Sequence, residues 1–448
     1  MNKPKHIAIT GAGLVGSLLS VYMAKRGFKV DIYERRPDSR KTQVYQGRSI
    51  NLALSDRGWK ALEGVGLADK VKSIAIPMYR RVMHSIEGNL SYQPYGKNNQ
   101  AIYSVSRGLL NQLLLDEAET FEGVNLHFEH SCKEIDWQNA RLSFQNESGS
   151  IIESEFDYVF GADGAFSAVR NALMKTDRFS YEQEYIDHGY KELSIPAAAN
   201  GGFQMEKEAL HIWPRGEYML IALPNPDATF TCTLFFPFEG QHSFSTLNTP
   251  QKARAFFETV FPDALSLMPH FDNEWSQNPN SSLCIIRCKP WIKGKTALIG
   301  DAAHAIVPFY GQGMNAGFED CRILNDILEN SNNWFEAMEI YNNARKSSGD
   351  AIAELAMRNF IEMRDLTADP VFLLRKKIEA RFADRYPSLW TPLYSMVTFS
   401  HMPYEEALRL GKLHDKIMGE VMQRSDIAEM WDSPEVEASI LELAQRYL

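Results

Sequence analysis

The 448-residue chain lacks several features that would place a protein in a broad class at once. It has only five cysteines, an odd number, and their scattered positions suit neither a disulfide scaffold nor a zinc site. No apolar run of about 18 residues is present, so we expect no membrane-spanning helix. No signal peptide precedes the first strand-like stretch. These absences predict a cytoplasmic protein that has neither a metal nor a membrane partner.

Positive charge is also in short supply. The 47 lysines and arginines are outnumbered by 57 acidic residues, which gives a formal net charge of −10. An acidic chain repels phosphate backbones, so no nucleic-acid partner is expected. Hydrophobic residues make up 44% of the chain, enough to bury a large core. At this length we expect two or three structural regions.

The first forty residues carry a dinucleotide-binding pattern. A short apolar stretch at 6–10 runs into Gly11, Gly13 and Gly16, then into a helical pattern and a second apolar stretch that ends at Glu34. The first two glycines allow a tight turn and close approach to a pyrophosphate, and the third allows close helix packing. The helix start offers unpaired N–H groups to the phosphates, and Glu34 can accept hydrogen bonds from ribose hydroxyls. This motif alone does not separate FAD from NAD.

Two later segments repeat the pattern of an apolar strand that breaks into a glycine turn. The first is GADG at 161–164, and the second is GDAAH at 300–304, which leads into a further helix. In the second turn, Asp301 can hold a ribityl hydroxyl. The start of the following helix offers N–H groups and a positive dipole to the pyrimidine edge of a reduced flavin. That helix start comprises Gly313, Met314 and Asn315. The three elements in this order favour FAD.

The middle and the end of the chain have other patterns. From about 180 to 275 we expect antiparallel strands broken by proline-rich turns, at 211–213, 218–223 and 229–236, and residues 77–98 are compatible with the same layer. From about 315 onward the pattern is helical. The predicted fold class is α/β, with a Rossmann-type FAD-binding domain, an inserted, mainly antiparallel β-sheet substrate domain and a C-terminal helical region.

Domain boundaries follow from these patterns. The FAD-binding domain is expected to be discontinuous, and the substrate domain is expected to be formed by two of the intervening segments. The expected ranges are 1–76, 99–179 and 276–330 for the FAD-binding domain, 77–98 and 180–275 for the substrate domain, and 331–448 for the C-terminal helical region.

Taken together, GAGLVG, GADGAFSAVR and GDAAHAIVPFYGQGMN resemble the single-component FAD-dependent aromatic hydroxylases. Within that group, ALHIWPRGEYMLIALPN (209–225), FTCTLFFP (230–237) and YSMVTFS (394–400) are similar to the family that hydroxylates kynurenine. The likeness covers nearly the whole chain. It implies bound FAD, NADPH as a transient reductant, and conversion of L-kynurenine and O2 to 3-hydroxykynurenine through a flavin hydroperoxide.

The resemblance also implies roles for individual residues. Arg81 and Tyr95 would bind the α-carboxylate of the substrate, helped by Tyr394 and Asn359. From the residues alone, an ordinary surface arginine is the better interpretation of Arg81, Tyr95 would be a loop aromatic, and an exposed helical position is as good an interpretation of Asn359 as a ligand. The residues that would wall the aromatic ring are Leu210, Ile221, Phe235, Phe309 and Met363.

On the cofactor side, the resemblance implies that Arg107 and Asp301 contact FAD. Two positions depart from the pattern: Ala305 replaces a proline usual in the wider group, and Tyr310 stands where members of the family carry histidine. We interpret His304 as structural, because the ring amine of the proposed substrate already activates the carbon that is hydroxylated.

Three other functions remain open at this stage. A hydroxylase of a different aromatic acid would use the same arginine and the same apolar slot. A flavin-dependent reductase or dehydrogenase would share the cofactor motifs, and oxygen incorporation into product distinguishes it from a hydroxylase. A flavin-binding protein without activity is disfavoured, because every flavin element is intact.

Overall fold

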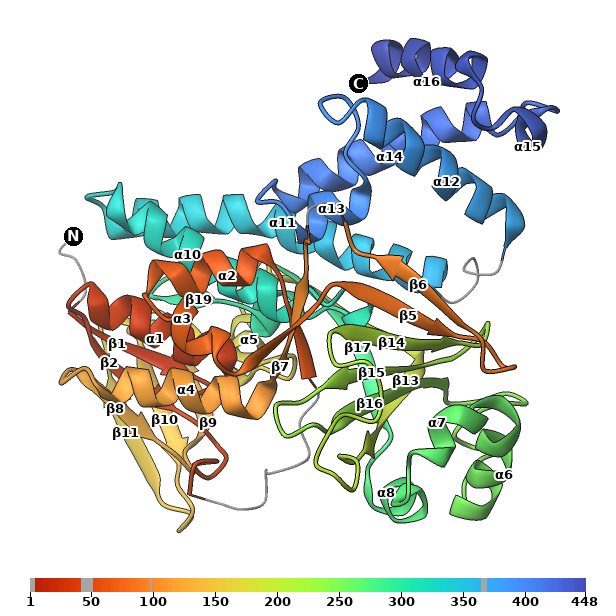
Figure 1. Ribbon diagram of the computed structural model, residues 1–448. Helices are drawn as coiled ribbons and strands as arrows, with labels where there is room; N and C mark the ends of the chain where they lie inside the picture. The colour runs from red at the N-terminus through yellow and green to blue at the C-terminus, as the bar shows by residue number, and fades with distance from the viewer. Residues whose placement is uncertain (1–4, 42–50, 97–98, 364–368) are drawn as a thin grey trace.

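The computed structural model describes residues 5–41, 51–96, 99–363 and 369–448. Figure 1 shows three regions: an N-terminal sheet flanked by helices, a second sheet beside it, and a group of C-terminal helices at the top of the view. This arrangement confirms the predicted α/β fold class.

The first sheet has six strands, and β1 (His6–Thr10) lies inside it between β12 (Tyr158–Gly161) and β2 (Lys29–Tyr33), parallel to both. The remaining strands are β8 (Val124–His127) beyond β2, and β19 (Thr296–Leu298) and β18 (Ile292–Lys293) beyond β12. Four of the five residues of β1 are buried, as expected of a parallel strand covered on both faces. The carboxyl ends of β1, β12 and β19 therefore lie next to one another at one edge of the sheet.

Helices cover this sheet. They are α1 (Leu14–Lys25), α2 (Asp56–Gly64), α3 (Ala68–Lys72), α4 (Arg107–Glu119) and α5 (Ala168–Leu173). Ser106 caps α4, because its hydroxyl accepts a hydrogen bond from the Leu109 N–H at 3.4 Å. Leu109 itself is 42% exposed and lies off the apolar face of the helix. The buried face instead follows the i, i+4 spacing of Leu110, Leu114 and Ala118.

Two small antiparallel sheets were not anticipated from the sequence. One has the strand order β3 (Asn51–Leu54), β7 (Ile102–Ser106), β4 (Ala75–Met78), and the other β11 (Ile151–Glu155), β10 (Arg141–Gln145), β9 (Ser131–Asp136). Strand β4 crosses the boundary that was expected at 76/77. Its pairing with β7 keeps residues 77 and 78 on the cofactor side.

The large second sheet has seven strands. In order, they are β17 (Ser281–Lys289), β13 (Ser180–Ile195), β16 (Phe230–Pro237), β15 (Met219–Pro224), β14 (Ala209–Pro214), β5 (Arg80–His84) and β6 (Leu90–Pro94). All neighbours are antiparallel except β5 and β14. The three predicted strands are confirmed, and residues 80–84 and 90–94 of the 77–98 segment join the same sheet. Strand β17 falls in the range assigned to the FAD-binding domain but pairs with β13 in this sheet, so the proposed domain ranges do not follow the sheets there.

The end of the segment expected to be strands is helical. It forms α6 (Pro250–Val260), α7 (Pro262–Ser266) and α8 (Phe271–Gln277) beside the seven-stranded sheet (Figure 1). The start signal of α6 is present in the sequence: Thr249 caps it by accepting from the Lys252 N–H at 3.4 Å, and Pro250 occupies the first turn. We overlooked that signal.

The C-terminal region is helical, as predicted. Helix α10 (Gly313–Glu329) packs on α1 and α2, and α11 (Trp334–Ile361) runs from α10 toward the seven-stranded sheet. The other helices are α12 (Pro370–Arg385), α13 (Leu393–Thr398), α14 (Tyr404–Val421), α15 (Ile427–Met430) and α16 (Pro434–Tyr447). Among the described residues, no helix is long and apolar enough to cross a membrane.

Candidate active site

The glycine loop after β1 is shaped by close backbone contacts. Gly11 has φ +95°, and a Cβ there would lie 2.5 Å from the Ala162 carbonyl oxygen. A Cβ at Gly16 would lie 1.9 Å from the Gly11 carbonyl oxygen. Among the described atoms, none lies within 4 Å of a Cβ placed at Gly13. Gly11 and Gly16 are thus required by the packing of the protein itself, whereas Gly13 leaves open space beside the loop for a ligand.

Glu34 braces this loop from the end of β2. One carboxylate oxygen accepts from the Ala12 N–H at 3.1 Å and the other from the Arg36 N–H at 3.0 Å. The Asn111 amide nitrogen donates to the Ala12 carbonyl oxygen from the opposite side at 3.0 Å. A carboxylate has about four acceptor positions, so Glu34 retains acceptor capacity for ribose hydroxyls. Its role toward the ribose stays a prediction.

The GADG turn after β12 is fixed internally. Asp163 accepts from the Ser167 hydroxyl at 2.5 Å and from the Ala168 N–H at 2.7 Å, and Ser167 in turn caps α5 by accepting from the Arg170 N–H at 2.9 Å. Burial nevertheless raises the pKa of Asp163 above its ordinary value. The buried guanidinium of Arg170 donates to the Ala165 carbonyl oxygen at 2.6 Å and to the Ala302 carbonyl oxygen at 3.0 Å. Arg170 therefore joins the second glycine turn to the third.

The third turn presents Asp301 at the start of α9 (Asp301–His304), directly after Gly300 with φ +61°. The side chain of Asp301 reaches solvent, yet surrounding protein atoms raise its pKa by burial, against the opposing influence of His304 and Arg107. Arg107, the first residue of α4, is exposed as well. An exposed carboxylate and an exposed guanidinium that influence each other are suited to contact one ligand.

Helix α10 begins beyond the left-handed Gly311 (φ +66°). The Asn315 side chain is fully engaged: its oxygen accepts from the Ser55 N–H at 2.9 Å, and its nitrogen donates to the carbonyl oxygens of Ala53 and Gly311 at 2.8 Å each. The Asn315 side chain therefore positions the helix start, and only backbone N–H groups of Gly313, Met314 and Asn315 are left to contact a flavin.

The three glycine turns follow β1, β12 and β19, which are adjacent strands, so all three lie at the carboxyl edge of one parallel sheet. This edge is where open α/β sheets bind dinucleotides. The open face at Gly13, the exposed Asp301 and the free N–H groups of α10 fit an extended FAD molecule.

On the other side of the site, Arg81 projects from β5 against two stacked aromatic rings. Its guanidinium carbon lies 4.8 Å from the ring centre of Tyr95 and 4.6 Å from that of Tyr394, and the two rings are stacked at 5.6 Å. Burial lowers the pKa of Arg81, but the Tyr394 and Tyr95 hydroxyls outweigh this effect and raise the pKa. Over the described residues, no carboxylate pairs with Arg81. The Arg81 guanidinium is therefore a sheltered cation that could bind the carboxylate of a ligand.

The neighbouring Arg80 faces the opposite side of β5. Its side chain is 45% exposed, its Nε lies 2.7 Å from a Glu206 carboxylate oxygen, and its guanidinium carbon lies 4.9 Å from the Tyr92 ring centre. Strand alternation separates the two arginines, which sequence alone cannot distinguish.

Tyr95 offers a second polar group beside Arg81. The residue is only 7% exposed, and its hydroxyl interacts with Arg81 and Tyr394 without a hydrogen bond of good geometry to either described residue. Burial raises the pKa of Tyr95, so the hydroxyl is a neutral donor at physiological pH. A neutral hydroxyl in this place can still donate to an acceptor outside the protein, and its role toward a substrate stays a prediction.

The five residues expected to wall the aromatic ring lie near one another, and their role toward a substrate stays a prediction. Phe309 lies 4.9 Å from Phe235 and stacks on Phe360 at 4.1 Å, measured between ring centres. Ile221 and Tyr394 pack against both this aromatic cluster and the neighbouring cluster that contains Tyr95. The remaining wall residues, Leu210 and Met363, pack against the Tyr95 cluster and the Phe309 cluster respectively. All five wall residues therefore belong to two adjoining clusters.

The Asn359 side chain on α11 contacts other residues of the protein. Its amide nitrogen donates to the Phe309 carbonyl oxygen at 2.7 Å and lies 3.2 Å from the Met363 sulfur. It therefore holds the wall in place, and its help in carboxylate binding stays a prediction. Tyr310, one of the two departures, stacks on Tyr394 at 5.6 Å with an interplanar angle of 13°.

Sequence reasoning missed a chain of buried charges beneath the site. It runs from Arg57 through Glu319, Arg345 and Asp320 to His304, and each member is at most 3% exposed. His304 lies 2.5 Å from an Asp320 carboxylate oxygen and stacks on Trp291, which agrees with a structural role. The adjacent acids Glu319 and Asp320 on a largely buried helix were the only signal in the sequence. In the described ranges no group of acidic, histidine or cysteine side chains could hold a metal, and the five cysteines are free thiols.

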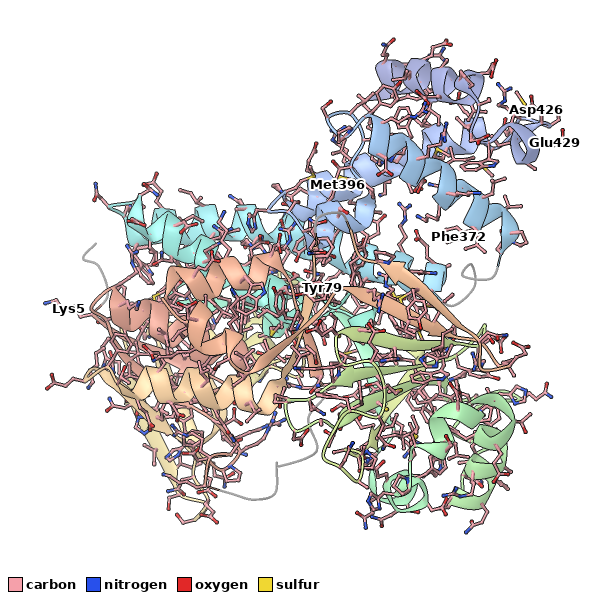
Figure 2. The ribbon with its side chains drawn as sticks, in the orientation of Figure 1. Lys5, Tyr79, Phe372, Met396, Asp426 and Glu429 are labelled. Carbon is pink, nitrogen blue, oxygen red and sulfur yellow. The ribbon has the colours of Figure 1, made fainter. Side chains whose placement is uncertain are left out.

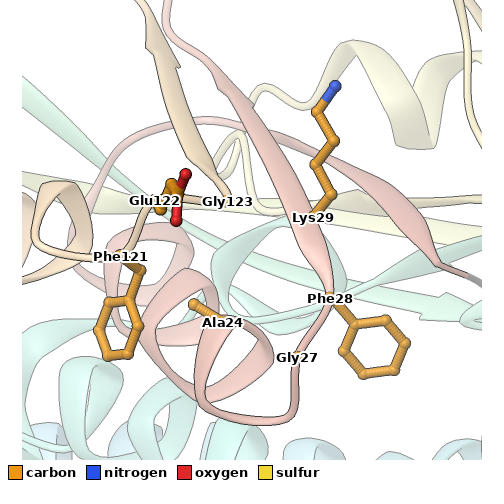
Figure 3. A pocket seen from close by; sticks show the side chains of 7 residues that line it. All are labelled: Ala24, Gly27, Phe28, Lys29, Phe121, Glu122 and Gly123. Atoms are coloured by element: carbon orange, nitrogen blue, oxygen red, sulfur yellow. The ribbon is translucent and has the colours of Figure 1, made fainter.

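Figure 3 shows an open pocket that lies elsewhere, lined by residues from the end of α1, from β2 and from the segment before β8. Its members include Ala24, Lys29 and Gly123. Ala24 is at the carboxyl end of α1, whereas the glycine loop is at the amino end, about 15 Å away at 1.5 Å per residue. This pocket faces the amino edge of the sheet and is no part of the active site.

Comparison with known proteins first defines the class of enzyme. The sequence model of the FAD binding domain family matches residues 5–353. Among solved structures, 2-methyl-3-hydroxypyridine-5-carboxylic acid oxygenase has the same fold, with a TM-score of 0.67, 18% identity and coverage of 83% of this chain and 96% of that one. The protein is thus an FAD-dependent enzyme with the fold of the flavin monooxygenases.

Closer relatives define the family within this class. The chain is 50% identical to a kynurenine 3-monooxygenase of Flavobacterium johnsoniae, over 98% of this chain and 99% of the relative. It is 44% identical to one of Dictyostelium discoideum, over 95% and 94% of the two chains. The chain belongs to the kynurenine 3-monooxygenase family.

Proposed function

We propose that this protein hydroxylates L-kynurenine at carbon 3 of its ring, with NADPH as reductant and O2 as oxygen donor. The observation that carries the substrate assignment is Arg81, a sheltered guanidinium beside the stacked rings of Tyr95 and Tyr394, with no carboxylate partner among the described residues. Full-length relatives named kynurenine 3-monooxygenase support the same substrate.

The cofactor half of the site would hold FAD, which takes reducing equivalents from NADPH and activates O2 when bound. Gly13 leaves room for the pyrophosphate beside the start of α1, and Asp301 would accept a hydrogen bond from the ribityl chain. The N–H groups at the start of α10 would face the pyrimidine edge and stabilise negative charge there.

The substrate half would hold and orient kynurenine. Arg81 would bind both oxygens of the amino-acid carboxylate, and the Tyr95 hydroxyl would donate to one of them. Phe235 and Phe309 would hold the aniline ring in a fixed orientation. Asn359 would keep Phe309 in place through its 2.7 Å hydrogen bond to the Phe309 carbonyl oxygen. An apolar wall of this kind also excludes water from the reacting atoms.

The decisive experiment is mass spectrometry of the product formed from kynurenine, NADPH and isotopically labelled O2. We expect 3-hydroxykynurenine with one labelled oxygen, and NADPH oxidation that is slow without kynurenine and much faster with it. NADPH oxidation that is indifferent to kynurenine and to other aromatic acids would contradict a substrate-gated hydroxylase.

A hydroxylase of another aromatic acid is the nearest alternative, because Arg81 would bind any carboxylate. A small panel of aromatic acids in the same assay separates the two. Reduction of the flavin without oxygen incorporation would instead indicate a reductase. The cytoplasmic location and the absence of a nucleic-acid partner remain predictions of the sequence.

A further inference from the structure

The buried charge chain has a regular alternation of sign. Arg57 lies 2.8 Å from one Glu319 oxygen, Arg345 lies 3.0 Å from the other, and Arg345 lies 2.7 Å from an oxygen of Asp320. The chain joins α2, α10 and α11. Two guanidinium groups thus balance two carboxylates inside the protein, which is the arrangement that makes buried charges tolerable.

One end of this chain lies at the flavin turn. The Asp320 carboxylate accepts from the Gly300 N–H at 3.2 Å and lies 2.5 Å from the His304 ring. Gly300 directly precedes Asp301, the residue expected to hold the ribityl chain. The Asp320 carboxylate therefore fixes the backbone on which the cofactor contact depends.

The other end lies at the substrate side. Arg57 donates from Nε to the Val397 carbonyl oxygen at 3.0 Å and from Nη2 to the Met402 carbonyl oxygen, and its guanidinium carbon lies 3.9 Å from the Tyr404 ring centre. Val397 belongs to α13, the short helix that carries Tyr394. In Figure 2, Met396 of the same helix marks the junction between the C-terminal helices and the rest of the molecule.

We propose that Arg57 is a positioning residue for the substrate site: it fixes α13 so that Tyr394 stands against Arg81. A fully buried guanidinium must keep its hydrogen bonds, because an unpaired buried donor is costly. In the observed placement of α13 the Val397 carbonyl oxygen accepts from Arg57, and the Tyr394 ring centre lies 4.6 Å from the guanidinium carbon of Arg81. This inference rests on the proposed function, since it assigns Tyr394 to kynurenine binding.

A merely structural arginine would behave differently from a positioning one. Loss of general packing would lower the melting temperature and weaken FAD and kynurenine binding together. Loss of positioning would weaken kynurenine binding selectively and would act through Tyr394. Equilibrium titration of kynurenine into the FAD-saturated enzyme, followed by flavin absorbance, measures the second effect without relying on turnover.

The test variant is Arg57→Lys, which keeps the charge beside Glu319 but carries all its donors on one nitrogen, which cannot span Glu319 and the Val397 carbonyl oxygen as the guanidinium does. We expect kynurenine affinity to fall about ten- to thirtyfold and FAD affinity to change less than about threefold. Should this variant fail to fold, Glu319→Gln weakens the same contact with a smaller change, and the same selective loss is expected from it.

Arg170→Lys is the matched control. Arg170 is also a buried arginine that donates to backbone carbonyl oxygens, but its partners, Ala165 and Ala302, belong to the flavin turns. We expect the reverse result: weaker FAD binding, with kynurenine affinity of the FAD-saturated enzyme changed less than about threefold. Equal losses of kynurenine affinity in the two lysine variants would overturn the proposal.

A double-mutant cycle with Tyr394→Ala provides the final test. If Arg57 acts through Tyr394, then Arg57→Lys should cost little further affinity once Tyr394 is already alanine. Additive losses would overturn the positioning role while leaving kynurenine as substrate intact. A wild-type enzyme whose flavin spectrum ignores kynurenine would instead contradict the proposed function itself.

Discussion

The cofactor half and the substrate half of the site are built from different parts of the polypeptide. On the cofactor side, backbone shape comes first: Gly11, Gly16 and Gly311 permit turns and close contacts, and the side chains of Glu34 and Asn315 hold that backbone. On the substrate side, the side chains themselves form the site. Arg81, Tyr95, Phe309 and Tyr394 come from segments far apart in the chain.

This difference determines how each half tolerates change. A backbone-built site fails when an atom is added where two backbones touch, because neither backbone can move away cheaply. A site built from side chains loses function when an atom or a charge is removed, but the surrounding structure stays folded. Substitutions in the two halves should therefore separate FAD binding from kynurenine binding.

The largest effect is expected from Gly16→Ala. The added Cβ would stand 1.9 Å from the Gly11 carbonyl oxygen, so α1 cannot keep its place against the loop. We expect complete loss of bound FAD, measured by absorbance of the purified protein. The control is Gly419→Ala, also inside a helix, where no described atom lies within 4 Å of the new Cβ. That change should leave FAD bound and stabilise α14 by up to about 1 kcal/mol.

Next in size is Arg81→Met, which removes a charge from the substrate half. Because the carboxylate would lose its main partner in a sheltered site, we expect kcat/KM for kynurenine to fall about thirty- to a thousandfold, or about 2–4 kcal/mol, with normal FAD content. Arg80→Met is the control and should cost less than about threefold, since Arg80 is exposed and pairs with Glu206. If Arg80 proves to be the sensitive position, the assignment of the two faces of β5 is wrong.

A smaller effect is expected from Asp301→Ala. The charged hydrogen bond to the ribityl chain is worth about 1.5–3 kcal/mol, so FAD affinity should fall about ten- to a hundredfold in a folded protein. Kynurenine affinity of the FAD-saturated variant should hardly change, because Asp301 belongs to the cofactor half. Unchanged FAD affinity, measured by equilibrium titration of the apoprotein, would remove Asp301 from the site.

The smallest effect concerns acid stability. Burial lowers the pKa of His211, which lies in the seven-stranded sheet, to about 4. An unfolded histidine takes up its proton near pH 6.5, so the unfolded state binds more protons between about pH 6.5 and 4, and stability falls as pH falls through this window. From pH 7 to about 5.5 the loss attributable to His211 should be about 1 kcal/mol, measured by denaturant unfolding.

The matching group in the six-stranded sheet responds at lower pH. Burial raises the pKa of Asp31, but the His127 and His6 side chains outweigh this effect and hold the pKa below its ordinary value. The stability that Asp31 contributes is therefore lost only below about pH 4.

Two variants test the assignment to His211. His211→Gln should flatten the loss of stability between pH 7 and 5.5, whereas the exposed His242→Gln should leave that loss unchanged. A loss that is identical in all three proteins would contradict the assignment to His211.

Much of the cofactor half was predictable because its signals are local. The glycine spacing from Gly11 to Gly16, the acid at Glu34 and the turn at Asp301 each lie within one strand-turn-helix segment, where short-range geometry decides the structure. The segment 250–277 was missed although Thr249 and Pro250 mark a helix start there, since proline was interpreted as a strand breaker.

The substrate half could not be derived from spacing. Whether Arg80 or Arg81 faces the site depends on the register of β5 against β14, and a shift of one residue would exchange them. The resemblance to a family named Arg81, but only the folded sheet gives the reason.

The sequence by itself determined the fold class, the cofactor and the family, because glycine turns and strand ends are encoded within short segments. The tertiary structure alone decided that Arg57, Glu319, Arg345 and Asp320 form one buried chain. Buried charges on separate helices leave no periodic pattern, and each becomes tolerable only when its opposite charge arrives from another part of the chain. The same long-range packing brings Tyr394 against Arg81, although the two residues are 313 positions apart in the sequence.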